Sequence, residues 1–246
     1  MRLKDKIAVV TGGASGFGEG IARKFAEEGA RVVIADVNID AARVLAKDLD
    51  GLAVRTDVSQ AEDVAMLAEQ TTVRYGDVDI LVNNAGIGQA PQTLETLSED
   101  LFDHIFAVNA KSVYLTARAF VPHMKVRKRG AILNIASTGG VSPRPELTWY
   151  NASKGWMITA TRAMAIELAP FGIRVNAINP VAGETPLLAT FMGGNTPAAR
   201  AKFLSTIPLG RFSTPADIAA ASCFLCSDEA AMITGVAMEV DGGRCI

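Results

Sequence analysis

The stretch Thr11-Gly12-Gly13-Ala14-Ser15-Gly16-Phe17-Gly18 decides the fold, because it joins an apolar run to an amphipathic pattern. The run before it, Lys6–Val10, reads as a buried strand, and Gly18–Glu28 after it has the period of a helix. Glycine lets a backbone turn tightly and approach a pyrophosphate, which then meets the helix N-terminus. The loop therefore predicts a dinucleotide site, although an ordinary turn would also use glycine. The three glycines concerned are Gly12, Gly16 and Gly18.

The rest of the chain alternates between the same two kinds of segment. Near-continuous apolar runs are typical of a parallel sheet covered by helices on both faces. The expected strands are Lys6–Val10, Arg31–Ala35, Leu52–Arg55, Ile80–Asn83, Ala131–Ala136, Arg174–Ile178 and Ala237–Val240. The expected helices are Gly18–Glu28, Ile39–Leu49, Ala61–Arg74, Leu101–Val108, Ser112–Val126, Ser153–Ala169 and Pro215–Cys226. This order predicts an α/β fold with a doubly wound parallel sheet (Rossmann) of about seven strands, as a single domain over residues 1–246.

Residues 184–212 break the alternation. They contain the turn-rich Gly193-Gly194-Asn195-Thr196-Pro197 and follow a strand, where α/β proteins bind ligands. The segment is too long for a simple connection, which predicts a substrate-binding lid. Its apolar side chains predict an apolar pocket, although each could equally pack the lid onto the core. They are Leu187, Leu188, Phe191, Met192 and Phe203, of which Leu187 and Met192 are the predicted substrate contacts.

Composition excludes several classes of protein. Half of the residues are apolar (49%) and the net charge is -2, which gives no general basic field for nucleic acid. The local basic run Lys125–Arg129 is expected to be a solvated helix end. No apolar stretch approaches the roughly 20 residues of a membrane span, and Met1–Lys6 leads into a strand rather than a signal peptide. Cys223 and Cys226 are interpreted as two small core residues, and a reduced cytoplasmic setting is expected, with no metal.

Tyr150 and Lys154 stand four residues apart in Tyr150-Asn151-Ala152-Ser153-Lys154, so they share one face of a helix. A tyrosine begins with a pKa near ~10, and each unit of depression needs ~1.4 kcal/mol. A positive charge at ~5 Å contributes ~3 kcal/mol at an effective dielectric constant of ~20. Lys154, helped by an oxidised nicotinamide, is therefore expected to lower the pKa of Tyr150 by about two or three units, into the range of a general base.

Asp36 indicates which dinucleotide is bound. It ends the second expected strand, where a carboxylate can accept from the ribose hydroxyls of adenosine and would repel a 2′-phosphate. Neither Val37, Asn38 nor Ser15 supplies a basic charge beside it. The pattern predicts NAD(H) rather than NADP(H). Asp36 could instead cap the next helix, but Asn38 already supplies that cap.

Taken together, these motifs resemble the short-chain dehydrogenase/reductase family. The resemblance covers essentially the whole chain, with the motifs in order at family-like spacing; besides the glycine loop and Tyr150-x-x-x-Lys154, they are Asn83-Asn84-Ala85-Gly86, Asn109, Ser137 and Asn179-Pro180. The family implies a catalytic tetrad of Asn109, Ser137, Tyr150 and Lys154. In this tetrad Tyr150 is the general acid/base, Ser137 orients the substrate oxygen and Lys154 holds the nicotinamide ribose. Asn109 interrupts a helix and holds a water. By themselves, Ser137 could only cap a turn and Asn109 could only end a helix.

The resemblance also implies coenzyme contacts after each strand. Asp57 and Val58 correspond to adenine contacts, and Pro180, Gly183 and Thr185 to a nicotinamide clamp. The chain departs from the family at Val181, where glycine is frequent, and at Phe17, where an aliphatic residue is more usual. The complete coenzyme set is Gly12, Ser15, Gly16, Phe17, Gly18, Asp36, Val37, Asp57, Val58, Asn84, Ala85, Gly86, Tyr150, Lys154, Pro180, Gly183 and Thr185. The substrate set is Ser137, Tyr150, Leu187 and Met192.

The activity implied is NAD-dependent oxidation of a secondary alcohol, or reduction of the ketone, on an apolar, cyclic or aryl compound or a polyol. The alternative is a 3-oxoacyl-[acyl-carrier-protein] reductase, often NADPH-linked, which Asp36 disfavours. Phe171 stands where many of those relatives have a basic residue, and Arg129 remains as a docking charge. A non-catalytic NAD-sensing protein is a third possibility, against which the intact tetrad argues.

Two further expectations concern surfaces. The helix Ser153–Ala169 is apolar around most of its girth, so it should pack on the sheet and on a neighbouring subunit. With the family, this predicts a homotetramer whose partners are small alcohols or ketones, not nucleic acid or membrane. Arg144 and Glu146 lie between Ser137 and Tyr150 and could meet a polar substituent, but a surface-loop position is the favoured interpretation.

Overall fold

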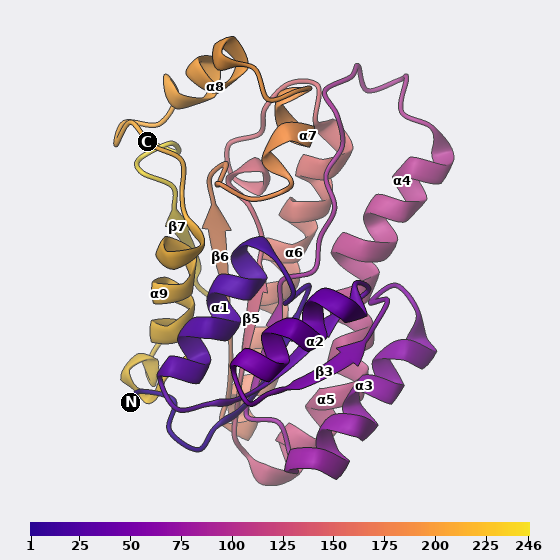
Figure 1. Ribbon diagram of the computed structural model, residues 1–246, viewed down its shortest axis with the longest axis vertical. Coiled ribbons are helices and arrows are strands. Elements are labelled where there is room, and N and C mark those ends of the chain that lie inside the picture. The colour runs from indigo at the N-terminus through magenta and orange to yellow at the C-terminus, as the bar shows by residue number, and fades with distance from the viewer.

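Seven parallel strands form the centre of the molecule in the order β3-β2-β1-β4-β5-β6-β7. The computed structural model describes all 246 residues (Figure 1). The chain runs outward from β1 to β3 and then returns to place β4 beside β1, so the direction of winding reverses between β1 and β4. Ligands bind outside the carboxyl ends of strands at such a point. The strands are β1 Ile7–Thr11, β2 Arg31–Asp36, β3 Leu52–Arg55, β4 Ile80–Asn83, β5 Gly130–Ile135, β6 Ile173–Pro180 and β7 Ala237–Val240.

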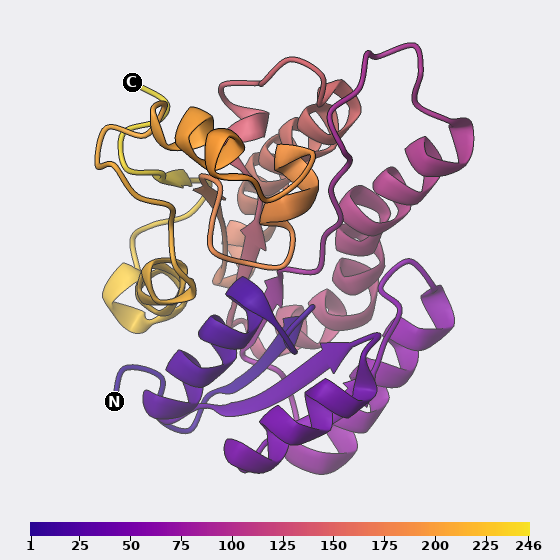
Figure 2. The same cartoon turned by 45° about the horizontal axis from the view of Figure 1, so that its top comes forward.

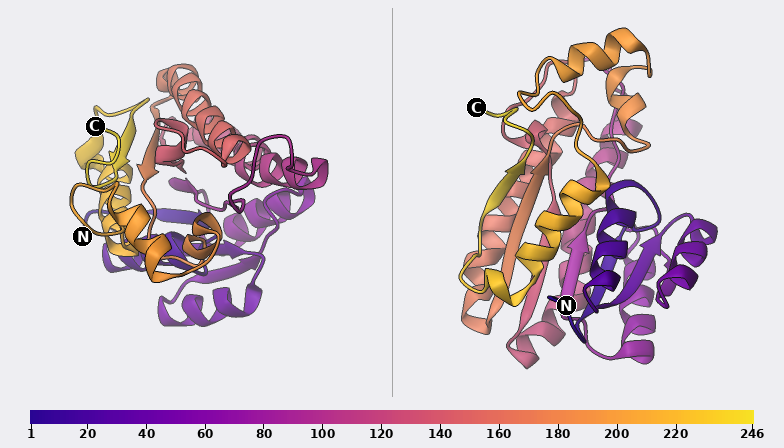
Figure 3. Two further views of the ribbon diagram at one scale, coloured as in Figure 1. Left: turned by 90° about the horizontal axis from the view of Figure 1, so that it is seen from above. Right: turned by 60° about the vertical axis from the view of Figure 1, so that its left-hand side comes forward.

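Helices cover both faces of the sheet, each over its own apolar cluster, and Figure 3 shows the two layers. One face is covered by α1 Gly16–Glu27, α2 Ile39–Asp48 and α9 Pro215–Cys226. The other carries α3 Ala61–Tyr75, α5 Ser112–Arg127 and α6 Thr148–Leu168. The predicted doubly wound fold is confirmed. Cys223 and Cys226 are buried in the first cluster, as expected.

Three further helices stand outside these layers. α4 Glu99–Phe106 continues through a π-helical turn, Ala107–Lys111, into α5. α7 Leu188–Met192 and α8 Pro197–Leu204 are the helical parts of the predicted lid, and they lie beyond the carboxyl end of β6 (Figures 1 and 2). Short 3-10 turns occupy Thr138–Gly140, Ala169–Phe171 and Asp228–Ala230. None of the helices is both long and apolar enough to cross a membrane.

The start of α6 differs most from the sequence prediction. α6 begins at Thr148, five residues before the expected Ser153, and its N-cap residue Leu147 makes no side-chain cap bond. Instead, the N–H of Tyr150 in the first turn donates to Gln89 Oε1 at 3.1 Å. A helix can begin without a local cap when a distant side chain satisfies its first N–H groups. The prediction for α4 was two residues late because it overlooked Ser98, whose side chain caps this helix.

A buried chain of hydrogen bonds fixes α5 and α6 on the central strands. Asn83 Nδ2 in β4 donates to Asn134 Oδ1 in β5 at 2.8 Å, and Asn134 Nδ2 donates to Thr161 Oγ1 in α6 at 2.8 Å. Thr116 Oγ1 in α5 donates to Asn83 Oδ1 at 2.9 Å. Fully paired buried polar groups specify one arrangement of the elements that carry them. They therefore position the helix on which Tyr150 and Lys154 lie.

The basic run after α5 is not simply a solvated helix end. Arg127 Nη1 lies 3.0 Å from Asp79 Oδ1, and Arg129 Nη2 lies 3.2 Å from the same oxygen. Asp79 is 8% exposed, and it also accepts from the N–H of Ile7. The charges of Arg127 and Arg129 are therefore paired with Asp79 at the amino end of the sheet. The expectation that the whole run is solvated is wrong for Arg127, because a buried carboxylate requires a paired cation.

Candidate active site

A cavity of about 460 Å³ opens at the carboxyl ends of the central strands. It contains sixteen of the seventeen predicted coenzyme residues, all except Gly18, together with Ser137 and Leu187. The strand order explains this convergence, because each predicted residue follows the end of a parallel strand or starts the next helix. The glycine loop and the Tyr150–Lys154 pair therefore share one cavity.

The glycines of the loop have separate structural roles. Gly12 and Gly16 have φ values of 59° and 56°, in the left-handed region that a side chain disfavours. Gly18 lies behind the loop, where an added Cβ would overlap the carbonyl oxygen of Gly12 and crowd Asn84. Gly12 and Gly16 thus shape the turn, and Gly18 allows α1 to pack closely. This arrangement fits the backbone cradle that a dinucleotide pyrophosphate requires.

A threonine that the sequence analysis did not select joins the loops after β1 and β4. Thr11 Oγ1 donates to Val82 O at 3.2 Å and accepts from the N–H groups of Asn84 and Ala85, each at 3.1 Å. Asn84 Nδ2 donates in return to the carbonyl oxygens of Thr11 and Gly12, both at 2.9 Å. Asn84 therefore supports the glycine loop as well as lining the cavity. The role of Thr11 could not be predicted from the sequence alone, because it depends on the pairing of β1 with β4.

The Asp36 carboxylate is held at the end of β2. Asp36 Oδ2 accepts from Ala14 N at 3.0 Å, and Oδ1 accepts from Asn38 N at 2.9 Å. The cap of α2 is Asn38, whose side chain accepts from Ala41 N at 3.1 Å. A carboxylate can accept about four hydrogen bonds, so these two leave capacity toward the cavity. Asp36 therefore keeps acceptor capacity beside the cavity, and Asn38 caps α2 as expected.

Tyr150, Ser137 and Lys154 meet at the opposite end of the cavity. The side chains of Tyr150 and Ser137 are neighbours: a Cβ added at Gly139 would lie 3.4 Å from Tyr150 Cε1 and 3.3 Å from Ser137 Oγ. Ser137 Oγ also accepts from Gly139 N at 3.0 Å. Lys154 is 4% exposed, and its Nζ donates to Ile135 O at 2.9 Å. The Ser137 hydroxyl thus caps a turn and also lies beside Tyr150. An ammonium has three donors, so Lys154 keeps two for other partners.

Burial is the main influence of the protein itself on the pKa of Tyr150, and the lowering expected from Lys154 together with an oxidised nicotinamide stays a prediction. Burial raises the pKa of Tyr150 to about 12, and the hydrogen bond with Ser137 lowers it only in part. Burial lowers the pKa of Lys154 to about 8. Both shifts have the same cause, because removing an ionisable group from water disfavours its charged form. The fold alone keeps the phenol protonated at neutral pH.

Asn109 lies in the π-helical turn and is fully buried. Its Oδ1 accepts from Ile87 N at 2.9 Å, while its Nδ2 donates to Ile87 O at 3.0 Å and to Ser153 Oγ at 3.1 Å. Asn109 therefore interrupts the helical run, as expected. It does not line the cavity, but a Cβ added at Gly86 would lie 3.3 Å from Asn109 Oδ1 and 3.4 Å from Lys154 Nζ. Asn109 and Lys154 thus both approach Gly86.

Four of the five apolar lid side chains named from the sequence line the cavity: Leu187, Leu188, Phe191 and Phe203. Phe191 lines it, with its ring centroid 4.8 Å from that of Tyr150. Met192 does not line it, because the next position on α7 points toward the small apolar cluster of the lid. Met192, a predicted substrate contact, is therefore not a lining residue of this cavity. The lid cluster contains Val181, Leu188, Ile207 and Phe212.

The departures from the family pattern have structural explanations. Val181 directly follows β6, is 4% exposed and packs in the lid cluster with Leu188 and Phe212. Glycine has no side chain to make these contacts. The Phe17 ring approaches Gly183 so closely that an added Cβ would overlap it. Phe17 therefore fills space that the absence of a side chain at Gly183 provides.

Arg144 also contradicts its predicted position. It lines the cavity instead of a surface loop, and its Nη2 donates to Thr206 Oγ1 of the lid at 2.9 Å. Glu146 is exposed, as expected, and its carbonyl oxygen accepts from Gln89 Nε2 at 3.2 Å. The cavity position of Arg144 depends on a lid partner that lies 62 residues further along the chain, and the surface-loop position was therefore favoured over a contact with the substrate.

Comparison with known proteins agrees with this geometry. The family described as Enoyl-(Acyl carrier protein) reductase matches residues 12–244. A 4-formylbenzenesulfonate dehydrogenase from Comamonas testosteroni is 46% identical, and the match covers the whole of both chains. A 3-oxoacyl-[acyl-carrier-protein] reductase from Thermotoga maritima is 37% identical, also over the whole of both chains. The chain belongs to the short-chain dehydrogenase/reductase family.

A solved structure extends the agreement to three dimensions. The 3-ketoacyl-(acyl-carrier-protein) reductase from Brucella melitensis, complexed with NADH, is 51% identical. It superposes with a TM-score of 0.94, and the match covers 99% of this chain and 100% of that one. With the family, the fold and the cavity in agreement, this chain is an oxidoreductase.

Proposed function

We propose that the protein interconverts a secondary alcohol and a ketone with NAD as coenzyme. One observation carries the proposal: a phenol beside Ser137 and a buried lysine lie in the same cavity as the glycine-rich loop. A hydride acceptor and a proton acceptor are the two groups that oxidation of a carbinol needs. The intact tetrad argues against a protein that only senses NAD.

NAD, when bound, supplies the acceptor for the hydride of the carbinol carbon. The glycine loop would hold its pyrophosphate, Asp36 its adenosine ribose, and Lys154 the ribose of its nicotinamide. Ser137 Oγ holds the substrate oxygen, and Tyr150 Oη takes the hydroxyl proton. Because burial holds the pKa of Tyr150 at about 12, proton uptake requires additional positive charge beside the phenol. Lys154 then stabilises the phenolate with its remaining donors, and in the reverse direction Tyr150 returns the proton.

Two observations favour NAD over NADP. The oriented Asp36 carboxylate would repel a 2′-phosphate, and the exposed Val37 beside it offers no compensating charge. The Brucella melitensis relative is described in complex with NADH. We therefore extend NAD dependence to this chain.

The substrate is proposed to be apolar, cyclic or aryl. Leu147, Leu187, Leu188, Phe191 and Phe203 line the cavity around Tyr150 and Ser137. The Comamonas testosteroni relative is named for an aryl compound, which supports the same class.

The second candidate is a 3-oxoacyl-[acyl-carrier-protein] reductase, the activity named for two relatives. A carrier protein must dock beside the cavity, and its charges would need basic partners there. Arg129 lies at the amino end of β5, away from the cavity, and pairs with Asp79. Loss of this docking charge disfavours the second candidate.

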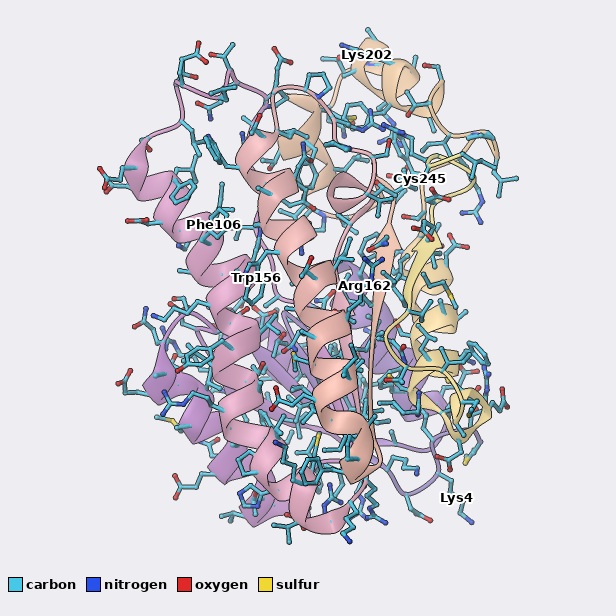
Figure 4. All side chains as sticks on the ribbon, turned by 180° about the vertical axis from the view of Figure 1, so that it is seen from behind. Lys4, Phe106, Trp156, Arg162, Lys202 and Cys245 are labelled. Carbon is cyan, nitrogen blue, oxygen red and sulfur yellow. The ribbon has the colours of Figure 1, made fainter.

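We also propose that the protein forms a homo-oligomer, in the simplest case a homotetramer. Its cytoplasmic location stays a prediction. Figure 4 shows α5 and α6 side by side on the outer face, with Trp156 on that surface. Trp156 is 41% exposed, Ile166 79% and Tyr114 53%. Exposed large apolar side chains on two neighbouring helices favour a protein interface. Size-exclusion chromatography that gives a stable monomer would contradict the assembly.

A substrate panel with both coenzymes tests the proposed activity. We expect reduction of NAD by cyclic and aryl secondary alcohols, followed at the absorbance band of NADH, and little turnover with NADP. A 3-oxoacyl thioester on a carrier protein should be a poorer substrate with NADH or NADPH than the cyclic ketones with NADH. A preference for NADPH and the thioester would establish the second candidate instead.

A further inference from the structure

Arg144 is a charged side chain in the cavity wall for which the protein supplies no opposite charge. It lies in the loop between Ser137 and α6, and its carbonyl oxygen accepts from Asn151 Nδ2 at 2.8 Å. Its guanidinium carbon is 4.4 Å from the centre of the Phe203 ring, and its single hydrogen bond is to Thr206 Oγ1. The side chain therefore reaches from the catalytic loop to the lid.

Other arginines withdrawn from solvent use their donors within the protein. Arg174 donates to the carbonyl oxygens of Leu225, Ile233 and Ser227. Arg127 is paired with Asp79. A guanidinium has five N–H donors, and Arg144 has one hydroxyl as its protein partner. Arg144 is thus the cavity arginine whose donors remain available to a ligand.

A second guanidinium adds to the positive charge. Arg244, in the segment after β7, donates from Nη1 to Ser142 Oγ at 3.1 Å, and its Nε is buried without a partner. Burial first, and then the charge of Arg244, lower the pKa of Arg144. Figure 4 shows that this C-terminal segment, at Cys245, lies beneath α8, which is marked by Lys202. Two desolvated cations near one wall favour an anion there.

We propose that Arg144 binds a carboxylate or sulfonate group of the substrate, and that the charge of Arg244 strengthens this binding. The inference rests on the proposed function and narrows its substrate class to ring-bearing alcohols and ketones with an anionic substituent. A guanidinium fork matches two oxygens of such a group. The ring would lie between Arg144 and Tyr150, against Leu147 and Phe191. The anionic group takes no part in bond making or breaking, so its contribution is to binding and orientation.

Matched substrates test the site. The compounds are 4-(1-hydroxyethyl)benzoate, its methyl ester and 1-phenylethanol, assayed with saturating NAD. The wild type should prefer the carboxylate by about tenfold or more in kcat/KM, because hydrogen bonds to charged groups contribute about 1.5–3 kcal/mol. Arg144→Gln should raise KM for the carboxylate about 10- to 100-fold and leave the two neutral alcohols within about twofold. Arg144→Lys should lie between, and Arg74→Gln, on the exposed end of α3, is the matched control.

Several outcomes would overturn the proposal. Equal losses on charged and neutral alcohols would show that Arg144 only positions the lid. A wild-type enzyme that does not prefer the carboxylate over the neutral alcohols would likewise overturn the proposed anion site. If Arg144→Gln unfolds early, Arg244→Gln provides the second variant, with a smaller loss confined to the anion. If Arg144→Gln impairs only a carrier-protein thioester and not its neutral N-acetylcysteamine analogue, the anion is the carrier's phosphate and the proposal fails.

Failure of the proposed function has a different signature. In that case no alcohol is oxidised, yet binding can still be measured. Calorimetric titration of Tyr150→Phe enzyme with 4-acetylbenzoate and with acetophenone, in the presence of NADH, tests the anion site without turnover. Tighter binding of the carboxylate, lost in Tyr150→Phe/Arg144→Gln, would support the site even if the activity is another. Equal binding of the two compounds would overturn it.

Discussion

The two ends of the cavity are built in different ways. At the coenzyme end, the loops after β1 and β4 are neighbours because their strands are paired, and Thr11 and Asn84 bond across that pairing. At the substrate end, side chains from irregular segments meet, as when Gln89 accepts from Tyr150 N and Arg144 donates to Thr206. The first end follows from the strand order. The second depends on tertiary contacts that no ladder specifies.

This difference suggests that the two ends can be disabled separately, most completely at Tyr150. Tyr150→Phe keeps the ring that packs on Phe191 and removes only the hydroxyl. We expect kcat to fall by about 10³-fold or more, because general acid–base catalysis contributes about 10²–10⁴-fold and no other phenol lines the cavity. NADH affinity, measured by fluorescence titration, should stay within about twofold. Residual turnover above a few per cent would refute the role of Tyr150.

Lys154 lies where the two ends meet, and its burial predicts a dependence of stability on pH. The unfolded lysine keeps its proton up to its ordinary pKa of 10.5, whereas the folded one loses it near pH 8. Between these values the unfolded state binds more protons, so the free energy of unfolding rises with pH. From pH 7 to 10 this rise should amount to about 2–3 kcal/mol relative to Lys154→Met, which lacks the group.

Urea denaturation at pH 7, 8.5 and 10, at one protein concentration, measures this difference. Tyr150 is common to both proteins, so its own titration cancels to first order. Lys47→Met, at an exposed position of α2, controls for the added methionine. Parallel pH curves for wild type and Lys154→Met would show that Lys154 is as well solvated as a surface lysine.

The same contrast explains what the sequence could and could not predict. All seven strands were predicted because buried parallel strands leave continuous apolar runs, and the residues after them therefore converge as expected. Tyr150 and Lys154 share a helix face for a local reason. The early start of α6 was missed because its cap, Gln89, is remote in sequence. Phe191 and Arg144 line the cavity, whereas Met192 packs against the lid cluster. These positions depend on how the lid folds back over the cavity, which composition does not encode.

A paired substitution gives the finest test of this comparison. Gln89→Leu removes the acceptor of the Tyr150 N–H in a side chain that is 2% exposed. Thr11→Val similarly removes the acceptor of the Asn84 and Ala85 N–H groups at the coenzyme end. Each leaves buried donors unpaired, which costs about 1–3 kcal/mol of stability. Both substitutions replace a polar side chain that accepts from backbone N–H groups by an apolar one, so their functional effects can be compared.

The two variants should affect different kinetic constants. Gln89→Leu loosens the first turn of α6, so we expect kcat to fall about three- to tenfold, as positions shift relative to the reacting groups. NADH affinity should stay within about twofold, because the Gln89 side chain does not line the cavity. Thr11→Val should weaken NADH binding about three- to tenfold, with kcat largely retained at saturating coenzyme. If both variants reduced kcat and affinity to the same extent, the two ends would form one cooperative unit, and the division between strand-specified and tertiary-specified parts of the cavity would not hold for function.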